Sequence, residues 1–390
     1  MSTRKFAAVA AGLTLALSLA ACGGGGAGGG EETTDTTDDG TTEEAPEEGG
    51  LIGVAMPTQT SSRWIADGDA VKSGLEDLGY EVDLQYANDD IPTQQQQIDA
   101  MISKGATALI IAAIDGTTLS GQLQSAADKG IPVISYDRLI RDSENVDFYV
   151  SFDNFQVGVQ QATSLLVGLG VLNADGSEGD ATGPFNIELF AGSLDDNNAH
   201  FFFKGAMSIL QPLIDDGTLV VKSGQTTIEQ VNILRWQQET AQRRMEDLLT
   251  STYSDGTKVQ GVLSPYDGLS RGIIVALQNA GYPATIAEGF PIVTGQDAEI
   301  ESVKLIADDV QFSTIFKDTR LLAAQAVIAA TAYLNGEEPE ANNTEDYDNG
   351  VKVVPSHLDE STIIYADNIQ SELVDSGYWS AEEVESGIAD

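Results

Sequence analysis

A repeated alternation of short apolar runs with longer helical segments is the strongest constraint on the fold of this chain. Residues 51–56 are an apolar run of strand length, residues 64–78 have helical periodicity, and residues 81–86 alternate like a strand. The alternation continues to residue 334. Continuous apolar strands separated by helices are typical of parallel sheets covered on both faces. About ten such units exceed one sheet of ordinary width, so the sequence predicts an α/β protein with two doubly wound parallel-sheet lobes.

The remaining expected elements follow the same order. Further strands are expected at 108–113, 132–136, 146–152, 186–190, 219–221, 261–264, 291–295 and 313–316. Further helices are expected at 92–103, 117–129, 156–169, 199–215, 239–251, 269–280 and 321–334. The helix at 92–103 has clear ends, because Asp90 can cap it, Pro92 fits its first turn and Gly105 can stop it. In open parallel sheets ligands bind outside the carboxyl ends of the strands, which directs attention to polar residues there.

Residues 1–21 have the organisation of a signal peptide. Arg4 and Lys5 precede an apolar run that is too short to span a bilayer stably, and small residues follow it. The sequence Leu19-Ala20-Ala21-Cys22 resembles a bacterial lipoprotein processing box, in which the cysteine becomes the lipidated N-terminus. We therefore expect a lipid anchor at Cys22 on the outer face of the cell membrane. A cleaved signal without lipid and a buried core cysteine are the alternatives.

Cysteine and histidine usage restricts the metal chemistry of the mature domain. Cys22 is the only cysteine, which excludes a disulfide framework and a cysteine-based zinc site. The two histidines, His200 and His357, leave little for a histidine cluster. Residues 173–180 are rich in oxygen side chains but miss the spacing of a calcium loop. We therefore expect neither a metal nor a cofactor.

The segment 22–50 and the overall charge point to an extracytoplasmic protein with a tether. Glycine, threonine and acidic residues dominate 22–50, which has too little apolar surface to bury, so we expect a disordered tether behind the lipid. The formal net charge is −42 at pH 7, which argues against nucleic acid and against adsorption to anionic lipid. A solvated acidic surface is the simplest interpretation, and it says nothing about the ligand.

Polar and charged side chains cluster directly after the expected strands. They are Ser61-Ser62-Arg63-Trp64, Asp137-Arg138, Asp195-Asp196-Asn197-Asn198, Tyr266-Asp267, Gln296-Asp297 and Lys317. A sugar hydroxyl donates one hydrogen bond and accepts two, so carboxylates and amides can take its proton while arginine, lysine and asparagine donate back. The C–H faces of a pyranose pack on aromatic rings, for which Trp64 and Trp236 are candidates.

Each of these residues also has an ordinary structural explanation. Asp137 and Arg138 are compatible with a surface ion pair, Trp64 with a core anchor, and Lys317 with a solvated side chain. Their joint occurrence at successive strand ends is what indicates a binding site.

Several short segments between residues 51 and 378 carry a family resemblance. They are Ser62-Arg63-Trp64, Gln97-Ile98-Asp99-Ala100-Met101, Ala113-Ile114-Asp115-Gly116, Ser135-Tyr136-Asp137-Arg138, Ser151-Phe152-Asp153-Asn154, Gly192-Ser193 with Asp196-Asn197-Asn198, Ser264-Pro265-Tyr266-Asp267, Gly295-Gln296-Asp297-Ala298 and Phe316-Lys317. Together they resemble the sugar-binding subunits of bacterial ABC importers, most closely the xylose-binding and multiple-sugar-binding branch. The resemblance implies a type I periplasmic binding protein fold with a three-strand hinge, whose crossings are expected near Asp153, Lys317 and Val353. The implied N-terminal lobe is 51–153 plus 318–352, and the C-terminal lobe is 154–317 plus 353–390.

The resemblance also implies roles for individual residues. Positions that hydrogen-bond the sugar match Arg63, Asp137, Arg138, Asn198, Asp297 and Lys317, and aromatic positions around the ring match Trp64 and Trp236. Asp267 joins this set from its place at a strand end, and Asn197, Tyr266 and Asn154 are further candidates. Tyr266 stands where the xylose-binding proteins carry asparagine, which argues against a strict xylose preference. Asn154, Gln296 and Lys317 lie near the expected crossings, so a role beside the hinge is their alternative.

The sequence therefore predicts a monomeric sugar-binding lipoprotein that closes two lobes around a monosaccharide and delivers it to an ABC permease. The expected ligand is xylose, glucose, galactose, arabinose or a related aldose or sugar acid. A sensory binding protein that presents its sugar to a receptor kinase or chemoreceptor is the alternative.

Other classes of protein lack their signatures in this chain. The adjacent pairs Asp89-Asp90 and Asp195-Asp196 are not the facing carboxylates of a glycosidase, no G-x-S-x-G motif is present, and neither histidine has an evident nucleophile partner. We therefore do not expect an enzyme. A repressor is not expected either, because the N-terminus has no basic helix-turn-helix.

Overall fold

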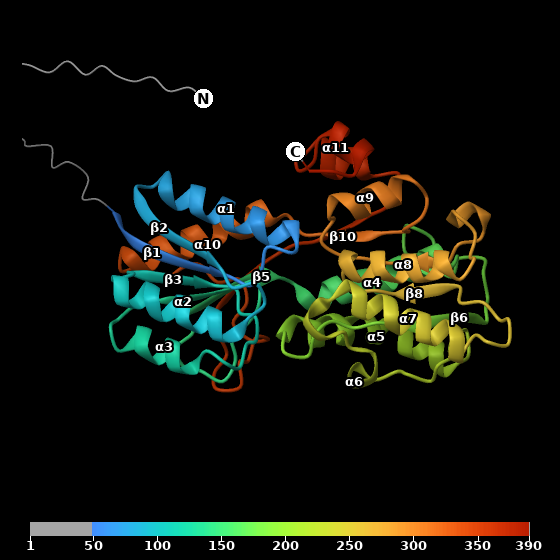
Figure 1. The fold of residues 1–390 in the computed structure, drawn as a ribbon, viewed down its shortest axis with the longest axis horizontal. Coiled ribbons are helices and arrows are strands. Elements are labelled where there is room, and N and C mark those ends of the chain that lie inside the picture. The colour runs from blue at the N-terminus through green and yellow to red at the C-terminus, as the bar shows by residue number, and fades with distance from the viewer. Residues whose placement is uncertain (1–48, 390) are drawn as a thin grey trace, which may run out of the picture. The chain divides into compact units, whose positions relative to one another are not determined.

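The computed structural model describes residues 49–389, which form two parallel sheets, each sandwiched between helices (Figure 1). The predicted signal peptide 1–21 and residues 22–48 of the predicted tether 22–50 lie outside the described residues. The last two residues of that tether, Gly49 and Gly50, instead begin strand β1. No helix of the described part is both long enough and apolar enough for a transmembrane span.

The first sheet has six strands in the order β11-β5-β4-β3-β1-β2, and all of its pairings are parallel. These strands are β1 (Gly49–Met56), β2 (Tyr80–Tyr86), β3 (Ala108–Ile111), β4 (Val133–Tyr136), β5 (Phe148–Phe152) and β11 (Ser356–Asp359). The apolar strands bury side chains on both faces. One face packs against α1 (Ser62–Glu76) and α10 (Thr319–Leu334), and the other against α2 (Ile91–Lys104) and α3 (Ser120–Ala127) (Figure 1).

The second sheet has four parallel strands in the order β7-β6-β8-β9. They are β6 (Phe185–Leu189), β7 (Leu219–Val221), β8 (Gly261–Leu263) and β9 (Ile292–Val293). Helices α4 (Asn154–Gly168) and α5 (Asn197–Asp215) cover one face, and α7 (Gln238–Ser251) and α8 (Asp267–Asn279) cover the other. Short helices at Ile228–Val231 (α6), Leu234–Trp236 and Ile286–Glu288 lie in the connections.

Helix α2 shows how local sequence sets an element. The Asp90 side chain accepts a hydrogen bond from the Thr93 amide at 2.8 Å, which satisfies one free donor of the first turn. Gly105 has a φ of 91°, a left-handed conformation that ends the helix and suits glycine. The helix buries Ile98 and Met101 against the sheet. The predicted ends of this helix are confirmed to within a residue.

The C-terminal part of the chain departs from the predicted alternation. Strand β10 (Thr314–Phe316) does not extend a parallel sheet but pairs antiparallel with β12 (Thr362–Ile364). Helix α9 (Ile300–Ala307) precedes this pair, and a π-helical turn (Gln370–Val374) and helix α11 (Ala381–Ser386) follow it. Their apolar side chains form a small core of their own.

The chain passes between the six-stranded sheet and the rest of the fold three times, after β5, after β10 and after β11. The third crossing was expected near Val353, with residues 353–390 in the C-terminal lobe, and this expectation is wrong. Ser356–Asp359 pairs with β5 in the first sheet, so the crossing follows Asp359. The sequence Ser-His-Leu-Asp has neither an apolar run nor a clean alternation, because β11 is an edge strand with a half-exposed surface. The predicted architecture of two parallel-sheet lobes is confirmed.

Candidate binding site

The carboxyl ends of strands from both sheets face one pocket. Loops after β1, β2 and β4 supply one side, and loops after β6, β7, β8 and β9 supply the other. Lys317 follows β10, the antiparallel strand outside both parallel sheets. The pocket and its mouth enclose about 570 Å³. Its lining residues are Thr58, Thr60, Ser61, Arg63, Trp64, Asp89, Asp137, Arg138, Asp196, Asn198, Phe202, Arg235, Trp236, Tyr266, Gln296, Asp297 and Lys317.

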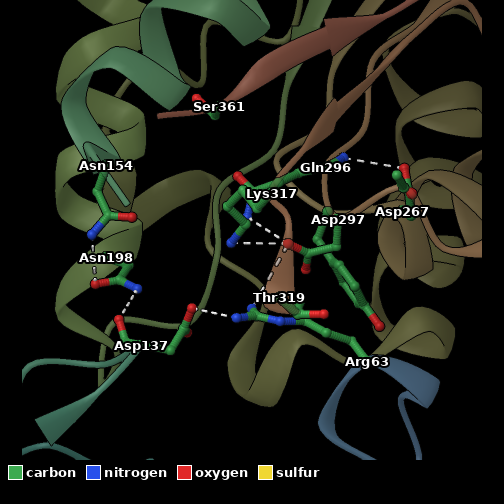
Figure 2. A network of polar contacts seen from close by, with 12 residues as sticks. Arg63, Asp137, Asn154, Asn198, Asp267, Gln296, Asp297, Lys317, Thr319 and Ser361 are labelled. Carbon is green, nitrogen blue, oxygen red and sulfur yellow. Dashed lines mark hydrogen bonds and ion pairs between the residues drawn. The ribbon is translucent and has the colours of Figure 1, made fainter. Parts of the chain in front are cut away.

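A network of buried charges forms one wall of the pocket (Figure 2). The guanidinium of Arg63 lies 2.5 Å from Oδ1 of Asp137 and 3.8 Å from Oδ1 of Asp297. The ammonium of Lys317, which is 2% exposed, lies 2.9 Å from the same oxygen of Asp297. Asp297 is therefore shared by two cations. Pairing of this kind is required here, because an isolated buried charge would be strongly destabilising.

Asp67 supports this wall from behind. Its carboxylate accepts hydrogen bonds from Nε of Arg63 at 3.0 Å and from the Tyr136 hydroxyl at 2.5 Å. Burial raises the pKa of Asp67 to about 6, although the Arg63 guanidinium opposes the shift. Burial alone would also raise the pKa of Asp137, but Arg63 and Lys317 outweigh it and hold that pKa below its ordinary value. Asp137 therefore ionises more readily than Asp67.

A second ion pair lines the pocket. Nε of Arg138 lies 3.1 Å from Oδ2 of Asp196, and Nε1 of Trp236 donates to the same oxygen at 3.2 Å. The other carboxylate oxygen of Asp196 accepts from the Asn198 amide at the start of α5. Burial raises the pKa of Asp196, and Arg138 counteracts it. Arg138 also donates to the carbonyl of Ala113 on its own side, and its ion pair with Asp196 joins it to the other side.

Asn198 connects the pocket to the first crossing between the lobes (Figure 2). Its Nδ2 donates to the backbone carbonyl of Asp137 at 2.7 Å, and its Oδ1 accepts from the Tyr149 hydroxyl at 2.9 Å. The same Oδ1 accepts from Nδ2 of Asn154, the first residue of α4, at 3.2 Å. Asn154 thus fixes the orientation of the Asn198 amide.

The aromatic lining lies mainly on the side of the four-stranded sheet. Trp236 packs edge-to-face with Tyr266 at 6.1 Å and with Phe202 at 6.3 Å between ring centroids. Its six-membered ring lies over Gly192, where any side chain would collide with it. Trp64 is different, because it is buried in the first core and has the guanidinium groups of Arg63 and Arg138 at 4.6 and 5.0 Å from its ring centroid.

The structure brings most of the predicted site residues together. Arg63, Trp64, Asp137, Arg138, Asn198, Trp236, Tyr266, Asp297 and Lys317 all line the pocket. Asp267, Asn197 and Asn154 do not line it. Asn154 lies behind Asn198, and Asn197 occupies the first turn of α5 without reaching the lining.

Asp267 is an internal support of the loops around the pocket. Asp267 is fully buried. Its carboxylate accepts hydrogen bonds from the backbone amides of Gln296 and Glu299 and from two side chains, through Nε2 of Gln311 and Oγ1 of Thr314. Four donors from its own side leave this carboxylate no free direction toward the pocket. It ties the loops after β8 and β9 to β10.

Several lining residues were not predicted as ligands. They are Thr58, Thr60, Ser61, Asp89, Asp196, Phe202, Arg235 and Gln296. Asp196 and Gln296 each stand beside a predicted residue, and Phe202 lies one helical turn after Asn198 on α5, so these could have been found from spacing. Asp89 and Arg235 have positive φ angles of 60° and 58°. The surrounding sequence shows no pattern that predicts these backbone conformations, so their place in the lining could not be predicted.

Among residues 49–389, no three His, Cys, Asp or Glu side chains are arranged to hold a metal ion. The carboxylates of the pocket are instead each placed beside a cation or a neutral donor. The lining sets Arg63, Arg138, Arg235 and Lys317 against Asp89, Asp137, Asp196 and Asp297. Such a surface suits a polar ligand without net charge.

The family model of the periplasmic binding protein domain matches residues 52–338. This chain belongs to the periplasmic binding protein family. The architecture, with two parallel-sheet lobes and a three-strand connection, is the type I fold of these proteins. This chain is 54% identical to the multiple sugar-binding periplasmic receptor ChvE of Rhizobium radiobacter over 335 residues. The aligned region covers 86% of this chain and 92% of that protein. The chain is 34% identical over 333 residues to the D-xylose-binding periplasmic protein of Escherichia coli K12, which covers 85% and 92%.

Solved structures of solute-binding proteins resemble this periplasmic binding protein closely. An ABC transporter solute-binding protein of Clostridium phytofermentans with bound β-D-glucose has a TM-score of 0.79 at 46% identity, over 86% of this chain and 99% of that one. A carbohydrate transporter solute-binding protein of Chloroflexus aurantiacus with D-glucose has a TM-score of 0.75 at 37% identity, over 86% and 98%. The predicted membership in the multiple-sugar and xylose branch is confirmed.

Proposed function

We propose that this protein captures a monosaccharide outside the cytoplasm by closing its two lobes and delivers it to an ABC importer. The observation that carries the proposal is the pocket itself, in which paired carboxylates, guanidinium groups, an ammonium and two side-chain amides surround a space with an aromatic side. Both lobes contribute to this lining. A hydroxylated ring can exchange hydrogen bonds with each of these groups, and its C–H faces can pack on Trp236. The names of the relatives support the same ligand class.

The proposed mechanism is capture by differential affinity. Arg63 and Asp137 belong to the side of the six-stranded sheet, and Asp196 and Asn198 to the other side. A sugar that contacts both sides favours the closed arrangement over the open one by the free energy of those additional contacts. The importer would then recognise the closed shape.

The ligands proposed are neutral aldoses such as glucose, xylose, galactose and arabinose. The balance of four acidic against four basic side chains in the lining supports a neutral ligand over a sugar acid. The ligand-binding set is proposed as Arg63, Trp64, Asp137, Arg138, Asn198, Trp236, Asp297 and Lys317, with Tyr266 beside them. Binding without catalysis and a lipid anchor at Cys22 complete the proposal.

A thermal-shift screen of the purified protein followed by isothermal titration tests the proposed ligand. Pentoses and hexoses are expected to raise the melting temperature, uronic acids less so, and phosphorylated sugars not at all. If no free monosaccharide raises it, the proposed function is wrong. Incubation with oligosaccharides should release no new reducing ends, since no catalytic pair is proposed.

A receptor role is the second candidate, because the relative from Rhizobium radiobacter is named a receptor. The same sugar-bound form would then be presented to a sensor protein. Genes for a permease and an ATPase beside this one would favour import. Genes for a sensor kinase in their place would favour the receptor role. Mass spectrometry of the membrane-extracted protein tests whether Cys22 carries the lipid.

A further inference from the structure

A further hydrogen bond joins the two lobes beside the pocket through side chains alone, besides the one between Tyr149 and Asn198. Oγ of Ser61, in the loop between β1 and α1, donates to Oε1 of Glu299 at 2.6 Å. Ser61 belongs to the side of the six-stranded sheet. Glu299 belongs to the other side, where it directly precedes α9. This bond links the two walls directly.

Glu299 is held in place independently of Ser61. The side chain is 2% exposed, and Oε1 also accepts from the Tyr266 hydroxyl at 2.9 Å. Oε2 pairs with the guanidinium of Arg271 at 2.7 Å, and the backbone amide of Glu299 donates to Asp267 at 2.9 Å. All of these partners belong to the same lobe, so the carboxylate presents one fixed acceptor to the opposite lobe.

Ser61 is unusual for a residue at the start of a helix. It is the N-cap of α1, where a serine oxygen ordinarily accepts a hydrogen bond from an amide of the first turn. Here the side chain makes no such cap. Its hydroxyl is directed across the pocket edge to Glu299 instead. The helix therefore forgoes a local stabilising bond, and the bond between lobes takes its place.

We propose that Ser61 and Glu299 form a closure clasp, a contact that stabilises the closed arrangement by the same amount whichever sugar is bound. The proposal rests on the proposed function of sugar capture by closure. A bond present only in the closed form favours that form by its own free energy, and every ligand of the closed form gains equally. Ser61 would then be a positioning residue, because the geometry commits its hydroxyl to Glu299.

The clasp differs from a sugar contact in a measurable way. Loss of a contact to one hydroxyl of the ligand weakens sugars with that hydroxyl more than sugars without it. Loss of the clasp weakens all sugars by one common factor and leaves their order unchanged. A hydrogen bond to a charged acceptor predicts a common factor of about tenfold or more.

The test uses Ser61→Ala with Ser177→Ala as the matched control. The Ser177 hydroxyl also donates to a carboxylate, Oδ1 of Asp175 at 2.6 Å, but both residues lie in one exposed turn of one lobe and neither lines the pocket. Dissociation constants for glucose, xylose and arabinose are measured by isothermal titration, and dissociation rates by stopped-flow fluorescence. Ser61→Ala is expected to raise all dissociation constants about tenfold with unchanged ratios, mainly through faster dissociation. Ser177→Ala is expected to leave the common factor near one.

A double-mutant cycle with Glu299→Gln should show that the two changes are not additive. Unchanged affinity in Ser61→Ala, an effect that differs between sugars, or an equal effect in Ser177→Ala overturns the clasp. If the wild-type protein binds no sugar, the proposed function fails, and small-angle scattering of the ligand-free proteins still decides the clasp. A larger radius of gyration in Ser61→Ala than in wild type and Ser177→Ala then supports the clasp, and equal radii overturn it.

Discussion

Two buried carboxylates, those of Asp297 and Asp267, follow strands of the same sheet and have different surroundings. In the pocket wall, Asp297 has two cations, Arg63 and Lys317, on one oxygen and faces the cavity. Behind the neighbouring loops, Asp267 accepts hydrogen bonds from two amides and two side chains of its own lobe and faces no cavity. Both follow a strand, and both were predicted as ligands. The comparison teaches that the number of internal donors, and not the position after a strand, separates a carboxylate that lines the pocket from one that only supports its loops.

The largest expected effect is the loss of affinity on Asp297→Asn. Asparagine has the same shape and tolerates the φ of 90° at this position, so the loop should keep its conformation. The change leaves Arg63 and Lys317 without their shared counter-charge in a dry wall, which should cost about 3 kcal/mol or more of binding free energy. Isothermal titration with the best sugar measures it. Affinity within threefold of wild type would remove Asp297 from the site.

The next effect concerns the pH dependence of stability around Asp67. Its pKa is about 6 in the folded protein and near 3.8 when unfolded, so the folded state binds the proton more tightly. The resulting stabilisation is complete below about pH 4 and is lost as the pH rises through 6, with a magnitude on the order of 3 kcal/mol.

Asp67→Asn does not titrate and is the comparison variant. Urea unfolding at pH 4 and pH 7 should show wild type losing stability relative to Asp67→Asn as the pH rises. If the difference in free energy of unfolding between wild type and Asp67→Asn stays constant from pH 4 to pH 7, the pKa of Asp67 is not raised.

Asp267→Asn is expected to change stability more than recognition. The carboxamide of asparagine has only one acceptor oxygen, so its NH2 group must face a donor such as the Glu299 backbone amide, which should lower the free energy of unfolding by about 2 kcal/mol. Urea denaturation measures this, and titration of the folded variant should show sugar ratios like those of wild type. If the ratios change and stability does not, Asp267 acts on the ligand and the comparison fails.

The smallest expected effect separates the two tryptophans of the pocket. Trp236→Phe keeps an aromatic ring beside Tyr266 but removes indole surface and the bond to Asp196, which should cost about 1 kcal/mol of affinity. Trp64→Phe removes volume from a packed core, so it should mainly lower the melting temperature. Isothermal titration measures the sugar affinity of both variants, and calorimetry measures their melting temperatures. A loss of affinity in Trp64→Phe together with a lower melting temperature in Trp236→Phe would contradict these roles.

Much of the architecture could be predicted because local signals agreed with each other. Apolar strands and the capped helix α2 are set by burial and by the groups of Asp90 and Gly105, all of which act over a few residues. Strand β11 was not predicted, because its pairing with β5 joins residues about 200 positions apart. Its edge-strand sequence shows neither an apolar run nor a regular alternation that would indicate a strand. The direction of β10 escaped for the same reason, since only its pairing with β12 decides it.

The candidate site was predictable to the level of residue type and strand end. Arg63, Asp137 and Lys317 were found because charged residues after apolar strands are visible in a sequence. The sequence could not show which partner each side chain hydrogen-bonds in the folded protein. Ser61 turns away from its own helix to Glu299, and Asp267 turns inward, and both choices depend on tertiary contacts.

The central claim is that a monosaccharide lies between the two lobes, in the wall formed by Arg63, Asp137 and Asp297 and beside Trp236. A crystal structure with the best-binding aldose tests it most directly. The account predicts sugar hydroxyls within hydrogen-bond distance of these three charged side chains, with the pyranose or furanose ring packed on the indole of Trp236. A sugar bound elsewhere on the protein, or hydroxyls met by none of the three, would contradict it.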